Sequence, residues 1–316
     1  MPDYKVVHGT KVQNFASDPP APSEGQVWYN STTATTKYFF LNPGAWATGG
    51  DLTVVKNNLA GAGTQTAGLA FGGTPTPGVS AQTEKYNGTS WTEVNDLNTA
   101  RYQLAGGGTQ TAALAFGGGA TPTVAITETW NGTNWTEVND LNTARKELAG
   151  CGTNTAALAF GGAATLNETE TWNGTNWTEV NNLNTGKKVL AGAGANNTAA
   201  LAFGGNPNGG STALTELWNG TNWTEVNDLN TGREKLAGAG TQTAALGFGG
   251  EPALTITESW NGTNWTELAD LSVGRRLLAG AGTNTSALAF GGQTPSNSAS
   301  TEEWIAGPTT ATLGST

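Results

Sequence analysis

The sequence predicts an all-β protein that folds as a six-bladed β-propeller of four-stranded antiparallel blades. A twelve-residue stretch that begins Trp-Asn-Gly-Thr-Asn-Trp at Trp130 recurs almost letter for letter at Trp172, Trp218 and Trp260, and a looser copy starts at Tyr86. A second marker, Phe-Gly-Gly, recurs every 42 to 45 residues, at Phe71, Phe116, Phe160, Phe203, Phe248 and Phe290. Each unit holds four short apolar runs between turn residues, and this arithmetic is typical of a propeller blade.

The second unit shows how the four expected strands differ. Residues 104–108 are Leu, Ala and Gly only, as expected for a strand beside a crowded central axis. Residues 112–116 are apolar on both faces, which indicates a strand packed between neighbouring blades. Residues 126–130 and 135–138 flank Asn131-Gly132, a strong signal for a tight hairpin because both residues tolerate positive φ. None of these runs has the 3.6-residue period of an amphipathic helix.

The two ends of the repeat predict how the ring closes. Six expected third strands end in an aromatic residue, at Tyr86, Trp130, Trp172, Trp218, Trp260 and Trp304. Only five fourth strands follow them, at Trp91, Trp135, Trp177, Trp223 and Trp265. The segment around Trp46 aligns with a fourth strand, so we expect the N-terminal segment to complete the blade that contains Trp304 and to remove its open edge. Residues 37–41 also align with a third strand and compete with residues 300–304 for that place.

These alignments divide the chain into three parts. Residues 1–25 do not repeat and carry three prolines within four residues, which favours an extended arm. Residues 26–305 form the expected propeller. Residues 306–316 form a polar C-terminal tail.

The order of residues within each unit resembles the kelch repeat. A Gly-Gly pair closes the second strand, an aromatic residue lies on the third, a Trp opens the fourth, and a basic residue follows a connecting turn. The resemblance covers residues 51–304. It departs from the usual kelch pattern in the Ala-Leu-Ala before Phe-Gly-Gly and in the Trp on most third strands. The resemblance implies a β-propeller.

Composition excludes several classes of partner. A formal net charge of −10 with only 14 Lys and Arg argues against binding nucleic acid or an anionic membrane surface. No apolar run is long enough to span a bilayer, and the first residues lack the apolar core of a signal peptide. Cys151 is the only cysteine, and other units hold Ala or Gly at its position, so we expect a small buried residue and not a reactive thiol. We expect a protein kept in a reducing cytosol, or exported without a signal peptide.

The sequence offers little for catalysis. His8 is the only histidine and precedes the repeats, so we expect neither a Ser-His-Asp triad nor a His-based metal site in the ring. Some kelch propellers are copper oxidases, and this ring cannot supply their histidines and Tyr–Cys crosslink. The carboxylates recur identically in every unit, whereas a catalytic site breaks symmetry. We therefore expect no enzyme activity and no cofactor.

Two recurring sets of residues have both a structural and a functional interpretation. The paired tryptophans are either sugar-stacking platforms or the core between blades, and their recurrence in every unit favours the core. A basic residue also recurs after each fourth strand, at Lys56, Arg101, Arg145, Lys187, Arg233 and Arg275. These cations either bind an acidic ligand at a channel mouth or pair with the recurring glutamates of the third and fourth strands. We favour pairing, because repeated Arg–carboxylate pairs hold adjacent elements in register.

The connections between second and third strands differ in length and sequence, whereas the hairpins on the other face barely change. In a four-stranded meander these variable connections share a face with the links between blades. Variable loops on a constant scaffold are where recognition usually lies, although neutral drift in exposed loops is an alternative explanation. The candidate binding residues on this face are Tyr102, Lys146, Lys188, Asn206, Asn208, Glu251, Arg276 and Gln293.

A second resemblance lies near the N-terminus. Residues 18–32, Asp-Pro-Pro-Ala-Pro-Ser-Glu-Gly-Gln-Val-Trp-Tyr-Asn-Ser-Thr, resemble segments of structural proteins of tailed bacteriophages, particularly fibres and appendages. This resemblance implies a non-enzymatic virion component, a fibre, appendage or decoration subunit that is assembled in the bacterial cytoplasm. Its arm would attach to other virion proteins or mediate homo-oligomerisation, and its loop face would recognise a protein or a host-surface glycan. The alternative is a kelch-type carbohydrate-binding lectin.

Overall fold

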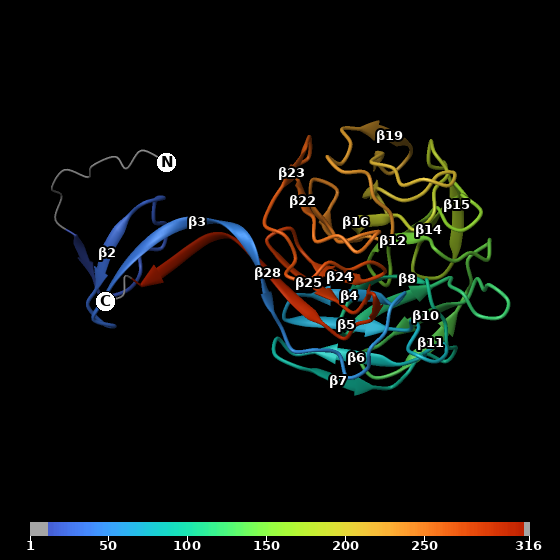
Figure 1. The fold of residues 1–316 in the computed structure, drawn as a ribbon, viewed down its shortest axis with the longest axis horizontal. Helices are drawn as coiled ribbons and strands as arrows, with labels where there is room; N and C mark the ends of the chain where they lie inside the picture. Colours follow the sequence, from blue (N-terminus) through green and yellow to red (C-terminus); the bar gives the residue numbers. More distant parts are fainter. Residues whose placement is uncertain (1–11, 313–316) are drawn as a thin grey trace. The chain divides into compact units, whose positions relative to one another are not determined.

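The computed structural model describes residues 12–312, and these residues divide into two compact units. The larger unit, Ala45–Ile305, is a six-bladed β-propeller (Figure 1). The smaller unit holds the described residues on either side of it. The prediction of an all-β, six-bladed ring is therefore confirmed.

Each of the first five blades is a four-stranded antiparallel sheet made from consecutive strands. Blade 1 holds β4 (Ala60–Thr64), β5 (Ala67–Phe71), β6 (Thr83–Tyr86) and β7 (Trp91–Val94). Blade 2 holds β8 (Ala105–Thr109), β9 (Ala112–Phe116), β10 (Thr127–Trp130) and β11 (Trp135–Val138). Blade 3 holds β12 (Ala149–Gly152), β13 (Ala157–Phe160), β14 (Thr169–Trp172) and β15 (Trp177–Val180). Blade 4 holds β16 (Ala191–Asn196), β17 (Ala199–Phe203), β18 (Thr215–Trp218) and β19 (Trp223–Val226). Blade 5 holds β20 (Ala237–Thr241), β21 (Ala244–Phe248), β22 (Thr257–Trp260) and β23 (Trp265–Glu267).

Blade 6 joins the two ends of the chain. Its strands are β24 (Ala279–Gly282), β25 (Ser286–Phe290), β28 (Thr301–Thr312) and β3 (Thr35–Thr48), in that order. A short hairpin of β26 (Gln293–Thr294) and β27 (Ser296–Asn297) lies between β25 and β28. The N-terminal strand β3 therefore supplies the fourth strand, as predicted, and β28 supplies the third. Residues 37–41 do not take the third place, because they belong to the same strand that supplies the fourth.

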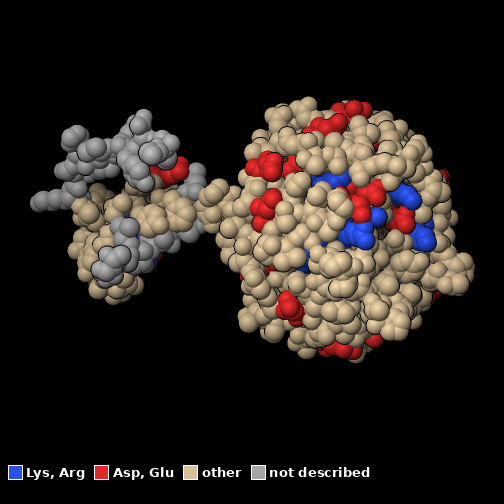
Figure 2. Space-filling view, viewed as in Figure 1, with Lys and Arg blue, Asp and Glu red and all other residues tan. Residues whose placement is uncertain are grey.

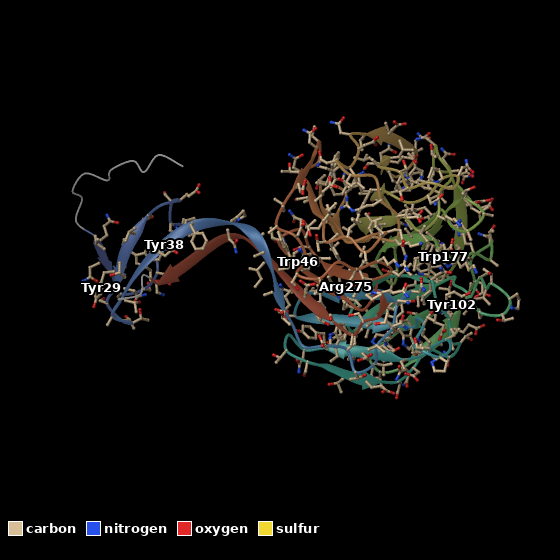
Figure 3. The ribbon with its side chains drawn as sticks, in the orientation of Figure 1. Tyr29, Tyr38, Trp46, Tyr102, Trp177 and Arg275 are labelled. Carbon is tan, nitrogen blue, oxygen red and sulfur yellow. The ribbon has the colours of Figure 1, made fainter. Side chains whose placement is uncertain are left out.

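Trp46 makes the contacts that a fourth-strand tryptophan makes in every other blade. Its ring lies 5.0 Å from that of Phe248 in blade 5 and 5.4 Å from that of Trp304 in blade 6. Its indole Nε1 donates a hydrogen bond to Thr257 Oγ1 of blade 5, at 2.9 Å. The same bond to the preceding blade recurs for the other five: Trp91 to Thr301, Trp135 to Thr83, Trp177 to Thr127, Trp223 to Thr169 and Trp265 to Thr215. The tryptophans thus form the core between blades (Figure 3 labels Trp46 and Trp177).

The innermost strands approach each other so closely that side chains are excluded. A Cβ on Gly106 of β8 would lie 2.4 Å from the Phe71 ring of blade 1. A Cβ on Gly107 would lie 2.8 Å from the backbone oxygen of Gly152 in blade 3. Glycine is required where backbones and rings pack this tightly. Cys151 occupies this layer in blade 3 and is buried there.

Buried ion pairs tie each blade to the connection that precedes it. Arg101 lies between blades 1 and 2 and pairs with Glu128 of blade 2 at 3.0 Å, with both side chains fully buried. The other oxygen of Glu128 accepts hydrogen bonds from the backbone and side-chain nitrogens of Asn98. Equivalent buried pairs are Lys56–Glu84, Arg145–Glu170, Lys187–Glu216, Arg233–Glu258 and Arg275–Glu302. We call these six cations the buried cation ring.

Burial acts against the charge of the buried cation ring. Loss of solvent lowers the pKa of Arg101, Arg145, Lys187 and Arg275, although the paired glutamates oppose the shift. A buried charge that lost its partner would be costly, because neither water nor a carboxylate would then stabilise it.

The smaller unit is organised around Asp18. Strand β1 (Gln13–Phe15) pairs parallel with β2 (Val27–Asn30), and β2 pairs antiparallel with the first part of β3. Asp18 accepts hydrogen bonds from Trp28 Nε1 at 3.1 Å, Asn30 Nδ2 at 2.8 Å and Lys37 Nζ at 2.8 Å. These bonds, that of Lys37 first, lower the pKa of Asp18 from 3.8 to about 2.

This arrangement differs from the predicted domain boundaries. The expected arm at 1–25 contains strand β1, and the ring begins at Ala45 instead of residue 26. Residues 27–30 pair with β1 and with residues 35–38 of β3, which precede Ala45. The expected tail is strand as far as Thr312, since β28 continues past the ring. Residues 1–11 and 313–316 of the predicted arm and tail lie outside the described residues.

Candidate functional site

The variable loops and the links between blades meet on one face of the ring. Single β-bridges join the two sets of connections, pairing Asn57 with Thr74, Tyr102 with Gly119, Lys188 with Asn206 and Arg276 with Gln293. The structure therefore brings together several of the residues that the sequence analysis chose as binding candidates. Their role in binding remains a prediction.

Arg276 is the centre of the most highly charged cluster on this face. Its Nη1 donates to both carboxylate oxygens of Glu251, and its Nε donates to Gln293 Oε1 at 3.1 Å. Lys235 Nζ lies 3.1 Å from Glu251 Oε2 and 3.5 Å from Glu234 Oε1. The bond to Glu251 raises the pKa of Arg276, and the bonds from Arg276 and Lys235 lower the pKa of Glu251. This cluster is a network of paired charges.

The remaining sequence-predicted residues lie in the neighbouring loops. Lys146 Nζ lies over the Tyr102 ring, 5.5 Å from its centroid, which is within the range of a cation–π contact. Asn206 donates its amide to Glu234, and Asn208 is exposed in the same loop. Lys188 Nζ lies 3.6 Å from Glu147 Oε2. Glu147 was not among the predicted residues.

A ring of six residues lies two positions after the buried cations and surrounds the opening of the central channel. All six are non-glycine residues with left-handed backbone, at φ between 48° and 60°. We call this set the mouth ring: Asn58, Gln103, Glu147, Val189, Lys235 and Leu277. The predicted residues Tyr102, Lys146, Lys188 and Arg276 each directly precede a residue of the mouth ring.

Backbone hydrogen bonds close the mouth ring into a circle. Each residue donates its N–H to the carbonyl of the equivalent residue in the preceding blade, at 2.8 to 3.0 Å. The donors and acceptors are Gln103 to Asn58, Glu147 to Gln103, Val189 to Glu147, Lys235 to Val189, Leu277 to Lys235 and Asn58 to Leu277. The left-handed backbone at these positions is thus part of how neighbouring blades are joined.

The mouth ring differs from the other left-handed positions that recur in every blade. The two residues after each Phe also have positive φ, and they are glycine in every blade, such as Gly117 at 65° and Gly118 at 116°. Glycine adopts this backbone without strain, whereas the same conformation costs other residues about 1–2 kcal/mol of conformational free energy. The six mouth-ring positions all have this strained backbone, and they hold six different side chains, including the β-branched Val189. Such strain occurs most often where side chains serve a function.

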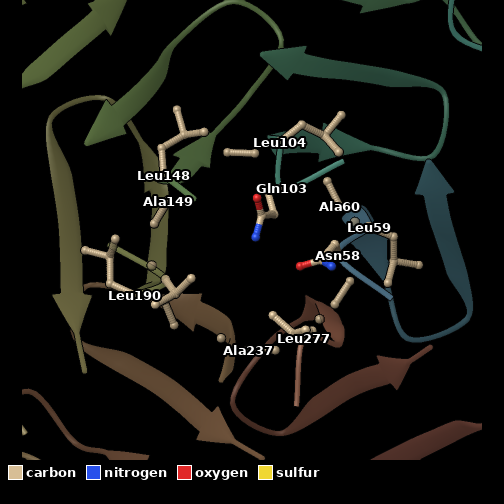
Figure 4. Close-up of a pocket in the computed structure, with 18 of the residues that line it drawn as sticks. Asn58, Leu59, Ala60, Gln103, Leu104, Leu148, Ala149, Leu190, Ala237 and Leu277 are labelled. Carbon is tan, nitrogen blue, oxygen red and sulfur yellow. The ribbon is translucent and has the colours of Figure 1, made fainter. Parts of the chain in front are cut away.

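The mouth ring lines a cavity of about 160 Å³ on the channel axis. The rest of its lining consists of Leu59, Ala60 and Gly61 and the equivalent residues of the other five blades (Figure 4 labels Leu59 and Ala60). The amides of Asn58 and Gln103 point into the opening. Gln103 Nε2 donates to Glu147 Oε1 at 3.2 Å, whereas Asn58 Oδ1 and Glu147 Oε2 are buried without a hydrogen-bond donor. Buried acceptors of this kind call for an explanation, because almost all such groups in proteins are satisfied.

The solvent-facing cations of the ring gather at this mouth. Apart from the buried cation ring, the basic side chains of the larger unit are Lys146, Lys188, Lys235 and Arg276, all on the mouth face, and Lys85, which lies over the Trp130 ring. Figure 2 shows Lys and Arg gathered in one area of the ring, with Asp and Glu between them. In a protein of net charge −10 this concentrates mixed charge at one opening.

Other chemical groups are few in the described part of the chain. Residues 12–312 contain no cluster of three or more His, Cys, Asp and Glu side chains that could hold a metal ion. Burial raises the pKa of Cys151 to about 12, so its thiol stays protonated. No helix among the described residues is both long enough and apolar enough to cross a membrane.

The mouth ring was missed for a physical reason. The sequence does show six different residues in one repeated column, and comparing columns would have selected it. Its left-handed backbone and its closed circle of hydrogen bonds arise only when six distant segments meet around an axis. The local sequence therefore predicts neither the left-handed backbone nor the circle of hydrogen bonds.

Comparison with known proteins does not assign the chain to a family. No protein-family model matches it, and no curated protein matches it significantly.

Proposed function

We propose that this protein is a non-enzymatic binding component of a tailed-phage virion, a fibre, appendage or decoration subunit. Its propeller presents the mouth ring and the surrounding loops to a protein or host-surface ligand. The smaller unit attaches the ring to other virion proteins or to further copies of the chain.

One observation carries the recognition part of this proposal. Six equivalent left-handed positions hold six different side chains at the mouth, whereas the left-handed Phe-Gly-Gly positions hold only glycine. A purely structural ring would gain stability from glycine at the mouth as well. Retaining side chains there, around a cavity with unpartnered acceptors, supports recognition.

The virion part of the proposal is supported by the resemblance of residues 18–32 to phage structural proteins, and the kelch resemblance supports the use of a loop face for binding. In the structure that segment contains Asp18, Trp28 and Asn30, which form one hydrogen-bonded cluster. A compact attachment unit on a rigid propeller suits a multicopy particle component.

The test of recognition is a variant with glycine at all six mouth-ring positions. Glycine satisfies the left-handed backbone, so the fold is retained while every mouth side chain is removed. Labelled full-length chain and this variant are compared for binding to a panel of bacterial cells and to purified phage particles. We expect the wild type to bind at least one target and the variant to lose that binding. Equal binding by both chains would refute recognition at the mouth.

The test of the virion role uses the natural particles. An antibody against the chain should detect it in particles purified from a lysate of cells that express its gene. Detection only in the soluble fraction would contradict a virion location.

A carbohydrate-binding lectin is the second candidate. The observation in its favour is a sector of the mouth face that holds the amides of Asn57, Asn58 and Gln103 and the ring of Tyr102, over which Lys146 lies. Amides and aromatic rings are the groups that bind sugar hydroxyls and sugar faces. A glycan array probed with the wild type and the all-glycine variant distinguishes this candidate.

A further inference from the structure

We infer that the cavity inside the mouth ring accepts one arginine or lysine side chain from a protein partner. The inference rests on the proposed function, since it names the ligand of the same mouth. Three properties of the cavity support it: unpartnered acceptors on one side, aliphatic side chains on the other, and the absence of aromatic side chains among the residues that line it.

The acceptor side consists of three consecutive positions of the mouth ring. Asn58 donates its amide nitrogen to Asn57 Oδ1, and Gln103 donates its amide nitrogen to Glu147 Oε1. One N–H of each amide is therefore committed to a neighbouring oxygen. Asn58 Oδ1 and Glu147 Oε2 are buried without a hydrogen-bond donor, and Glu147 Oε2 has the ion pair with Lys188 at 3.6 Å. A ligand that brings several N–H donors and a positive charge would satisfy both oxygens.

The opposite side of the mouth ring suits an aliphatic stem. Val189 and Leu277 lie on either side of Lys235, and Leu190, Leu236 and Leu278, each directly before an innermost strand, also line the cavity. Lys235 is paired with Glu234 and Glu251, so carboxylates already offset its charge. Arginine and lysine combine a cationic head with an apolar stem of this kind.

Lys188 is the cation that forms an ion pair with the acceptor side. Its Nζ lies 3.6 Å from Glu147 Oε2, which is longer than a hydrogen bond, and its side chain is 38% exposed. It is therefore held loosely and is free to move outward when a stronger donor arrives. A guanidinium offers two parallel N–H donors to a carboxylate, which the single ammonium of Lys188 does not.

A sugar is the weaker match for this cavity. Sugar sites commonly use an aromatic ring as a platform, and Tyr102, the nearest phenol on this face, is not among the residues that line the cavity. A neutral sugar would also leave the Glu147 charge uncompensated except by the loosely held Lys188. These two points favour a cationic side chain.

The experiment titrates the full-length chain with the peptide acetyl-Gly-Arg-Gly-amide and follows the methyl resonances of Val189 and Leu277 by NMR. We expect saturable shifts of these methyls. The same peptide with norleucine in place of arginine should bind at least tenfold more weakly, because it keeps the stem and loses the charge. Equal binding of both peptides would overturn the inference, as would shifts produced by a neutral saccharide and not by the arginine peptide.

Two variants connect the binding to the acceptors. Glu147→Gln keeps the shape and the bond from Gln103 and should weaken the arginine peptide about tenfold, since one charge-assisted bond is lost. Asn58→Gly removes the second acceptor without backbone strain and should weaken binding severalfold. The matched control is Glu137→Gln, the same charge change on an exposed strand, which should bind as the wild type. Unchanged affinity in Glu147→Gln would overturn the inference.

The failure of this inference differs from failure of the proposed function. If the all-glycine variant loses its cellular or particle target but the arginine peptide never binds, recognition at the mouth stands and the ligand class is wrong. If the all-glycine variant keeps its target, the mouth is not the recognition site and both proposals fail.

Discussion

The buried cation ring and the mouth ring lie two residues apart in the chain and follow opposite rules. In blade 2, Arg101 is fully buried and paired with Glu128, and its equivalents are Lys or Arg in all six blades. Gln103 lies at the channel mouth, and its equivalents are six different residues. The comparison shows that position within a blade, and not distance along the chain, decides how freely a residue varies.

The physical reason for the difference is the environment of each ring. A buried cation needs a carboxylate at a set distance, and a change on either side leaves a charge without a partner. A mouth residue must only keep its left-handed backbone and its N–H, so any side chain that tolerates the strain is accepted. Uniform residues therefore mark positions that ion pairing fixes, and unlike residues mark positions where the fold does not fix the side chain.

The largest effect is expected from breaking a buried pair. Glu170→Gln should lower the free energy of unfolding by about 3–5 kcal/mol, because Arg145 then lies buried opposite a neutral group. Urea denaturation of the full chain measures the loss. The double variant Arg145→Met, Glu170→Leu should recover most of it. A loss in the single variant below about 1 kcal/mol would contradict the comparison.

Ring closure is expected to depend on Trp46 nearly as strongly. Trp46→Ala should cost about 3 kcal/mol, since it removes contacts with Phe248 and Trp304 and the hydrogen bond to Thr257. Trp135→Ala, the equivalent change inside the ring, is the matched control and should cost a similar amount. If Trp46→Ala were neutral while Trp135→Ala was not, closure by β3 would not contribute to stability.

Two substitutions test the left-handed positions, one that removes a glycine and one that introduces a glycine. Gly161→Ala should destabilise the ring by about 1–2 kcal/mol or more, because its backbone is left-handed and its Cβ would lie 2.6 Å from Lys187 O. Val189→Gly should instead stabilise the ring by about 0.5–1 kcal/mol, since it relieves strain at the mouth. Thermal unfolding of both variants measures whether each substitution lowers or raises the stability of the ring. A destabilised Val189→Gly would mean that the Val189 side chain is retained for packing.

The smallest effect concerns the smaller unit, which has its own pH dependence. The pKa of Asp18 is lowered to about 2, so the folded unit binds this proton less readily than the unfolded chain. Its contribution is complete above pH of about 4 and is lost as the pH falls towards 2. The NMR resonance of the Trp28 Nε1 proton should shift over that window and stay unchanged in the same window in Asp18→Asn. A shift retained in the variant would show that another group causes it.

Much of the fold was predictable because its signals are local and repeated. The Asn-Gly hairpins, the Phe-Gly-Gly turns and the alternating apolar runs each specify a strand or a turn, and six copies average out the ambiguity of any one. The closing strand was also predictable, because Trp46 aligns with the fourth-strand tryptophans. The smaller unit was harder. Its parallel pairing of β1 with β2 has no hairpin signal, since parallel neighbours are not joined by a tight turn.

The candidate site was predictable only in outline. The variable loop connections indicated the face on which the mouth ring lies, and residues such as Lys188 and Arg276 lie on that face. The mouth ring itself was not predicted, because in the sequence Val189 and Leu277 are ordinary apolar residues of a loop.

By itself, the sequence determined the number of blades, the order of the four strands within a blade and which two segments of the chain close the ring. These depend on residue type and spacing, which the repeat displays directly. Only the tertiary structure decided which residues line the mouth and which acceptors lack a donor. Those properties depend on hydrogen bonds between equivalent positions of neighbouring blades, and such bonds exist only once the ring has closed.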